Sequence, residues 1–201
     1  ERAMEVNVRY ITDGTPGCGG HFKETPEDFE VEEIPAYLPC GEGEHVYLWV
    51  EKRGVAPPDA AKRIARHLGV PEGAISWAGL KDKHAVTRQW MSVQAKPERE
   101  AELKTFTDPD VSLLTVTRHR NKLKGGHLNG NKFRIRLSGV KDAGAARATI
   151  EQLETRGVPN YFGAQRFGRD AGNVAAARAW IVDGGPPPRA PWARKLFVSS
   201  L

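Results

Sequence analysis

The sequence predicts an α+β fold with a largely antiparallel sheet and flanking helices. Stretches with strand character follow one another in runs, and only a few helical stretches separate them. No Gly-x-Gly-x-x-Gly fingerprint follows a predicted strand, and no Gly-x4-Gly-Lys-Ser/Thr loop occurs. The 201 residues can bury a sizeable core, and 39% hydrophobic and 27% charged residues are typical of a globular protein. A doubly wound, nucleotide-cofactor fold is therefore disfavoured.

The first predicted elements are two strands and a helix. Residues 29–34 alternate apolar and acidic side chains, which predicts a half-exposed strand. Residues 46–50 (Val-Tyr-Leu-Trp-Val) predict a buried strand. Pro57 and Pro58 suit the first turn of a helix, and Gly69 marks its end.

The middle of the chain predicts further strands. Residues 75–78 form a short strand candidate, 90–93 resume extended structure, and 111–117 form another strand. Residues 97–104 are highly charged and predict a surface helix or loop. Residues 121–130 contain three glycines and predict a turn or mobile loop.

The last part of the chain predicts one strand and two helices. Residues 132–137 alternate Lys or Arg with Phe, Ile or Leu, which predicts a strand with one basic and one apolar face. Residues 143–153 predict a helix that stops at Gly157. Asn173 can cap another helix, and residues 184–191 form a Pro/Gly linker.

Charge is segregated along the chain. Residues 24–51 hold nine acids and no Lys or Arg, whereas residues 111–141 hold eight Lys or Arg and no acid. A basic block of this kind is the electrostatic footprint of a phosphate-backbone partner. A solvated basic face with no partner is the alternative, but the interleaved aromatics and glycines favour the phosphate partner.

The cysteines and the hydropathy narrow the class of protein. Cys18 and Cys40 cannot form a disulfide-rich scaffold. Together with His21 and His45 they hint at a zinc site, but structural zinc sites usually show tighter Cys-x2-Cys pairs, so free thiols in a reducing compartment are favoured. No apolar run approaches the roughly 20 residues that span a membrane, and no secretory leader is visible. We therefore expect a cytoplasmic protein without a membrane partner.

The segment 79–90 carries the candidate chemistry. Its one carboxylate, Asp82, lies among basic residues, namely Lys81, Lys83, His84 and Arg88. Neighbouring positive charge keeps such a carboxylate ionised near neutral pH. Asp82 is then either a nucleophile or base, or one half of a surface ion pair, and charge alone leaves both open.

Four longer motifs occur in order along the chain. They are Pro-Glu-Asp-Phe-Glu-Val-Glu-Glu (26–33), Gly-Leu-Lys-Asp-Lys-His-Ala-Val-Thr-Arg-Gln (79–89), Leu-Asn-Gly-Asn-Lys-Phe (128–133) and Gly-Val-Pro-Asn-Tyr-Phe-Gly-Ala-Gln-Arg-Phe-Gly (157–168). Together these motifs resemble the TruD family of pseudouridine synthases, over about residues 22 to 183.

The resemblance implies isomerisation of a uridine in tRNA to pseudouridine, at position 13 in bacterial members. It implies a mixed, mostly antiparallel sheet, with residues 1–168 as the N-terminal part of the catalytic domain. Residues 169–201 would begin a family-specific inserted domain. Family members continue past the equivalent of Leu201, so we expect a longer protein. The reaction has no redox change and implies no cofactor, no metal and no obligate protein partner.

The resemblance also assigns roles to individual residues. Asp82 is the implied catalytic residue, and Lys23 is expected to pair with it and orient it. The loop is expected to be supported by Lys81, Thr87 and Gln89. The flipped base is expected to stack on Phe133 and Phe29 and to hydrogen-bond Asn131.

The basic block supplies the expected contacts to RNA phosphates. These residues are Arg118, Arg120, Lys122, Lys124, Lys132, Arg134 and Arg136. The same block suits a non-catalytic RNA-binding or RNA-folding module, and only the Asp82 loop distinguishes the two. A zinc-dependent enzyme is a weaker third hypothesis.

Overall fold

A computed structural model of the protein describes residues 10–12, 14–159 and 172–187. The chain divides into two compact units. One is Gly19–Lys141, and the other combines Glu1–Cys18 with Asp142–Leu201. The predicted domain boundary at 168/169 and most of the fourth motif lie outside the described residues, so they remain predictions.

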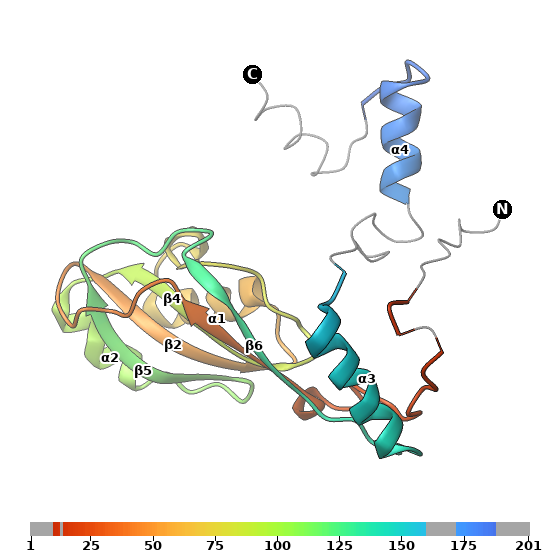
Figure 1. The fold of residues 1–201 in the computed structure, drawn as a ribbon. Helices are drawn as coiled ribbons and strands as arrows, with labels where there is room; N and C mark the ends of the chain where they lie inside the picture. Colours follow the sequence, from red (N-terminus) through yellow and green to blue (C-terminus); the bar gives the residue numbers. More distant parts are fainter. Residues whose placement is uncertain (1–9, 13, 160–171, 188–201) are drawn as a thin grey trace. The chain divides into compact units, whose positions relative to one another are not determined.

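The unit Gly19–Lys141 is built on one mixed, six-stranded sheet (Figure 1). Its strands are β1 (Phe29–Pro35), β2 (His45–Arg53), β3 (Ser76–Trp77), β4 (Val86–Gln94), β5 (Val111–His119) and β6 (Leu128–Ile135). The order is β5-β2-β4-β1-β6, and β3 pairs with β4. Only β1 and β4 run parallel among these pairs. The predicted mixed, mostly antiparallel α+β fold is confirmed.

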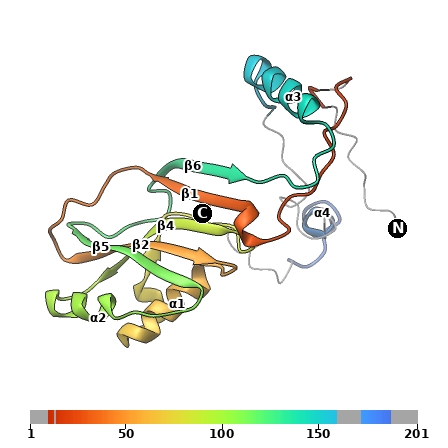
Figure 2. The same ribbon diagram turned by 90° about the horizontal axis from the view of Figure 1, so that it is seen from below.

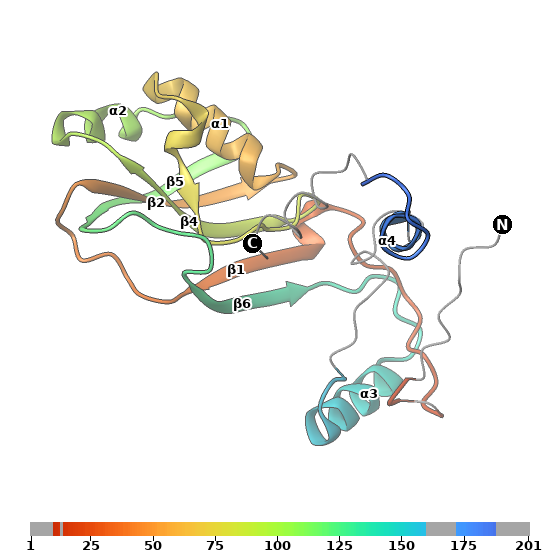
Figure 3. The same cartoon turned by 90° about the horizontal axis from the view of Figure 1, so that it is seen from above.

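Helices cover one face of this sheet. They are α1 (Pro57–Leu68) and the short α2 (Glu100–Lys104). The unit also contains three 3-10 turns, η1 (Pro26–Asp28), η2 (Glu72–Ala74) and η3 (Pro97–Arg99). Figure 3 shows α1 and α2 on the same side of the strands. As predicted, α1 begins at the Pro57-Pro58 pair and ends at Gly69, whose φ of 60° is the left-handed conformation that glycine adopts cheaply.

The alternation of β2 defines two faces. Val46, Leu48 and Val50 pack against α1 in the main core. Tyr47 and Trp49 point the other way and pack with Trp90. We call these the α1 face and the opposite face. Because paired residues share a face, the strand register extends this division across the sheet.

Strand β6 differs from its prediction. It starts at Leu128, inside the predicted loop, and ends at Ile135. The reason is backbone pairing with β1, which Figure 2 shows beside it at one edge of the sheet, and this pairing continues from Phe29↔Ile135 to Pro35↔Leu128. Glycine content argued for a loop, but ladder hydrogen bonds to a neighbouring strand outweigh a weak local propensity.

The second unit contributes two described helices, α3 (Ala143–Arg156) and α4 (Gly172–Ile181). The Asp142 carboxylate caps α3 by accepting a 2.9 Å hydrogen bond from the Ala145 amide. The predicted stop at Gly157 is confirmed. No helix within the described ranges combines the length and apolar character needed to cross a bilayer.

Candidate active site

A notch in the sheet positions the Asp82 loop. Strand β4 pairs with β1 through Arg88 and with β3 from Met91 onward, so the backbone of Gln89 and Trp90 lies between the two partners. The loop leaves the sheet here. The Trp90 amide donates to Glu33 Oε1 at 3.3 Å, which replaces a missing ladder bond.

Two contacts fasten the loop to this notch. Lys81 Nζ lies 2.8 Å from Glu33 Oε2, and both side chains are buried. The Gln89 side-chain amide donates to the Gly79 carbonyl at 3.1 Å. These bonds hold Lys81 and Gly79, which precede Asp82 in the loop, while Asp82 itself is half exposed. The supporting roles of Lys81 and Gln89 stay predictions.

Lys23 contacts the candidate nucleophile. Its Nζ lies 3.1 Å from Asp82 Oδ1, so the two residues are paired as the sequence predicted. The same ammonium sits 3.7 Å from the centroid of the Phe29 ring, a cation–π contact. Lys23 also has a φ of 60°, an uncommon conformation for a residue with a side chain. Such backbone conformations concentrate at functional sites.

Lys52 is a site residue that the sequence analysis missed. It is fully buried, and its Nζ donates a 2.7 Å hydrogen bond to the Asp82 carbonyl. Burial lowers the pKa of this amine to about 8, against the opposing effect of the Asp82 carboxylate. One signal was available: Lys52 falls on the same alternation as Val46, Leu48 and Val50, so it is a charge at an inward position.

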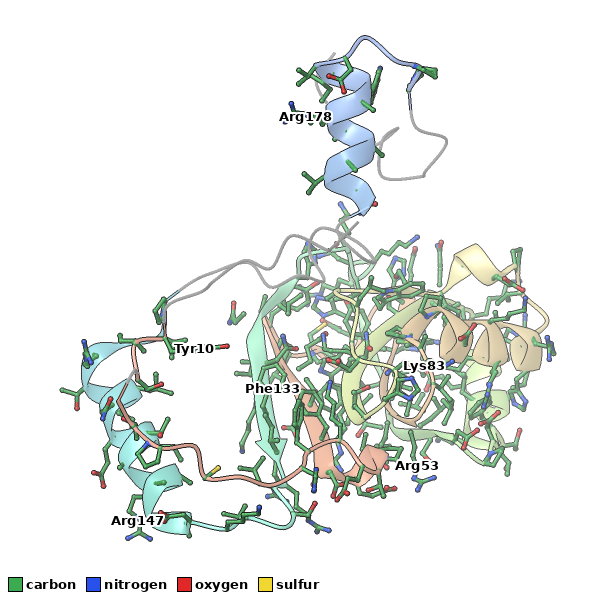
Figure 4. All side chains as sticks on the ribbon, turned by 90° about the vertical axis from the view of Figure 1, so that its right-hand side faces the viewer. Tyr10, Arg53, Lys83, Phe133, Arg147 and Arg178 are labelled. Atoms are coloured by element: carbon green, nitrogen blue, oxygen red, sulfur yellow. The ribbon has the colours of Figure 1, made fainter. Side chains whose placement is uncertain are left out.

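The predicted base-binding residues gather on the α1 face. Val31 pairs with Phe133 and Glu33 pairs with Asn131, so these side chains share the face with Phe29. The rings of Phe29 and Phe133 are 5.9 Å apart and tilted by 60°. Phe29 is buried, whereas Phe133 is 53% exposed. Figure 4 labels Phe133, which belongs to strand β6. Phe133 is the ring available for stacking.

Thr87 does not brace the loop by a hydrogen bond. Its hydroxyl is buried and has no hydrogen-bond partner among the described residues, and the same is true of Gln89 Oε1. Thr87 pairs across strands with Lys52, so both lie on the α1 face. A polar patch therefore continues the apolar core along this face towards Asp82.

The basic block separates into engaged and exposed cations. Arg118 pairs with Glu100 and donates to the carbonyls of Gly43 at 2.7 Å and Ala95 at 3.3 Å, and its side chain is only 14% exposed. Because the Arg118 guanidinium already has these partners and is largely buried, it is not available to contact an RNA phosphate. The other cations of the block are exposed, and three of them, Arg120, Arg134 and Arg136, form ion pairs within the described part of the chain.

The zinc hypothesis finds no support in the described part of the chain. No group of three or more His, Cys, Asp or Glu side chains there could hold a metal ion. The Cys40 thiol instead donates to the Glu42 carbonyl at 3.3 Å, and the Cys40 amide donates to His119 Nδ1.

Comparison with known proteins gives a consistent family signal. A model of the family "tRNA pseudouridine synthase D (TruD)" matches residues 5–186. The tRNA pseudouridine synthase D of Geobacter metallireducens is 52% identical, over 89% of this chain and 44% of that protein. That of Thermus thermophilus is 43% identical, over 96% of this chain and 54% of that protein. The chain thus spans about half the length of these curated relatives.

A solved structure agrees with the sequence relatives. The crystal structure of a candidate tRNA pseudouridine synthase D (TruD) from Methanosarcina mazei superposes with a TM-score of 0.75 at 31% identity. The superposed region covers 95% of this chain and 48% of the Methanosarcina mazei chain.

Proposed function

The chain belongs to the tRNA pseudouridine synthase D (TruD) family, and from this membership we propose that it isomerises a uridine in tRNA to pseudouridine with Asp82 as its catalytic carboxylate. One observation carries the assignment to this residue. Asp82 is paired to Lys23 at 3.1 Å, and Lys23 in turn contacts Phe29, whose ring packs against exposed Phe133. A carboxylate, a cation and a stacking ring are thereby adjacent.

The reaction breaks the bond between C1′ and N1, turns the uracil and joins C1′ to C5, with loss of the C5 proton. Asp82 serves this reaction either by attacking C1′ or by taking a proton from C2′. In both routes the carboxylate must be ionised and fixed against the ribose, and the Lys23 ammonium and the Lys52 bond to the Asp82 backbone supply that fixation.

The target nucleotide has to leave its stack to reach Asp82, which costs a few kcal/mol. Phe133 offsets part of this cost by stacking on the flipped base. Asn131, two residues earlier on the same face of β6, is placed to hydrogen-bond the uracil edge. Phe133 has no hydroxyl, so another group or water removes the C5 proton.

The test is release of tritium from tRNA labelled at uracil C5, with purified protein and with its Asp82→Asn and Asp82→Ala variants. The expected result is release by the wild type and none by either variant, while all three bind tRNA with the same affinity. Equal release after removal of Asp82 would show that the carboxylate is not catalytic. Binding without any release by the wild type would instead favour the non-catalytic RNA-binding module.

A further inference from the structure

A pocket lies on the opposite face of the sheet, away from Asp82. It has a volume of about 520 Å³, within the usual range for small-ligand sites. Its wall includes three histidines, His45, His119 and His127, and we call it the histidine pocket. His45 and Lys52 are seven positions apart on β2, so they lie on opposite faces and about 23 Å apart at roughly 3.3 Å per residue.

The chemistry of the histidine pocket is cationic. Arg120, Lys122 and Lys124 line it, and no carboxylate does. Arg120 pairs with exposed Glu42. Lys122 and Lys124 are exposed, and neither forms an ion pair with another described residue. Two ammonium groups beside a concave wall are the arrangement that binds successive phosphates of a nucleic acid.

The pocket also contains an aromatic platform. The rings of Tyr37 and His119 are stacked, with centroids 5.0 Å apart and planes 21° from parallel. Two hydrogen bonds hold the Tyr37 ring in place. The Tyr37 hydroxyl lies 2.7 Å from His127 Nδ1 and 3.3 Å from the hydroxyl of buried Tyr47. A rigid ring of this kind stacks on a nucleobase without a large loss of side-chain entropy.

One polar atom at the pocket wall is unsatisfied. His45 Nδ1 is buried and has no hydrogen-bond partner among the described residues. Burial also lowers the pKa of His45, so this ring is neutral at physiological pH. An unsatisfied buried group in a folded protein is uncommon, and a ligand or an ordered water would satisfy it.

We propose that the histidine pocket binds one nucleotide of the RNA, with its base stacked on Tyr37–His119 and its flanking phosphates on Lys122 and Lys124. This inference rests on the proposed function, because that function makes RNA the substrate. The bound nucleotide is a different one from the flipped uridine, since the pocket and Asp82 lie on opposite faces. The pocket thus anchors the RNA while chemistry proceeds elsewhere.

The first test removes the two charges. The Lys122→Gln/Lys124→Gln variant should bind a tRNA transcript at least about tenfold more weakly at 0.1 M salt. Its plot of log K against log salt should be shallower by about 1.4 to 1.8 for two lost phosphate contacts. The control is Lys96→Gln/Lys104→Gln, which removes two exposed lysines outside the pocket and should change neither quantity. The proposal is overturned if both double variants lose tRNA affinity equally, or if neither loses it.

The second test separates the ring from the hydroxyl. Tyr37→Leu should raise the Kd for tRNA about fivefold or more, because it removes the stacking surface. Tyr37→Phe keeps the ring and should bind within about twofold of the wild type. If Tyr37→Leu loses its melting transition, photocrosslinking of 4-thiouridine-labelled RNA to the wild type replaces it. An adduct on Tyr37 or His119 supports the pocket, and adducts confined to other residues overturn it.

The Asp82→Asn variant distinguishes this inference from the function on which it rests. Loss of tritium release in Asp82→Asn, with unchanged tRNA binding by the lysine variant, leaves the proposed function intact and refutes the pocket. Weaker tRNA binding by the lysine variant, with no tritium release by the wild type, supports the histidine pocket and refutes the proposed function.

Discussion

Glu33 and Lys81 form an ion pair of 2.8 Å between side chains that are 0% and 2% exposed. The Glu33 carboxylate uses its other oxygen to accept the Trp90 amide, so both oxygens are satisfied. The pair therefore closes the notch between β1 and β3 and fixes the residue before Asp82. A loop that must leave a sheet at a defined point needs such an anchor, because an unpaired strand backbone is costly when buried.

Replacing Glu33 by Gln should destabilise the protein strongly. The variant leaves the Lys81 ammonium buried without a counter-charge, which typically costs about 3–5 kcal/mol. Urea unfolding measures the change in the free energy of unfolding. The matched control is Glu72→Gln, which breaks the 2.9 Å pair of Glu72 with Lys62 at an exposed site. That change should cost about 1 kcal/mol or less. A loss for Glu33→Gln no larger than for this control would contradict the anchoring role.

Local patterns predicted the elements, whereas the polar connections between them required the structure. The double proline and Gly69 located α1 because their backbone preferences act within one turn. The pairing of Lys23 with Asp82 spans 59 residues of sequence and was accessible only through the family motifs. Rules that act within one turn or one strand cannot predict a contact between residues so far apart in sequence.

The sequence did not predict the roles of two residues near the Asp82 loop, and the physical reason is the same for both. Glu33 and Lys52 are charged residues at inward positions of strands, where alternation predicts apolar side chains. The sequence shows the irregularity but not the partner that makes the burial tolerable. A buried charge on an otherwise apolar alternation is therefore a signal for a support residue of a nearby site.

Lys52 should make stability depend on pH. The unfolded lysine keeps its proton up to about pH 10.4, whereas burial lowers the pKa in the folded protein to about 8. Between these values the unfolded state binds more protons, so the free energy of unfolding rises with pH. Relative to Lys52→Met, the wild type should gain about 1–2 kcal/mol between about pH 7.5 and 9.5.

Urea unfolding across this pH range provides the measurement. Lys104→Met removes an exposed lysine and should run parallel to the wild type. The upper pH limit stays below 10, because burial raises the pKa of Tyr47 and its titration would oppose the trend above its ordinary value. Parallel curves for wild type and Lys52→Met would mean that Lys52 is not a buried titrating amine.

Lys23→Met should slow turnover without weakening RNA binding. Under the proposed function, the Lys23 ammonium orients the catalytic Asp82 carboxylate, and loss of correct positioning costs about 10- to 100-fold in rate. Single-turnover rates at saturating tRNA measure this effect. Lys83→Met removes a neighbouring exposed charge of the same loop and should change the rate by less than about threefold, since one exposed charge contributes little. If Lys23→Met turns over at the wild-type rate, the 3.1 Å pair has no part in catalysis.

Phe133→Leu should lower kcat/KM for tRNA by about 5- to 150-fold, because stacking on one base is worth about 1–3 kcal/mol. Folding should be little affected, since the Phe133 side chain is 53% exposed. Phe133→Tyr retains a ring and should keep most of the activity. The control Ile135→Ala removes an exposed apolar side chain on the same face and should cost less than about threefold, because it offers no π surface. If Phe133→Leu and Ile135→Ala have equal effects, general apolar contact explains the role of this strand, and the flipped base stacks elsewhere.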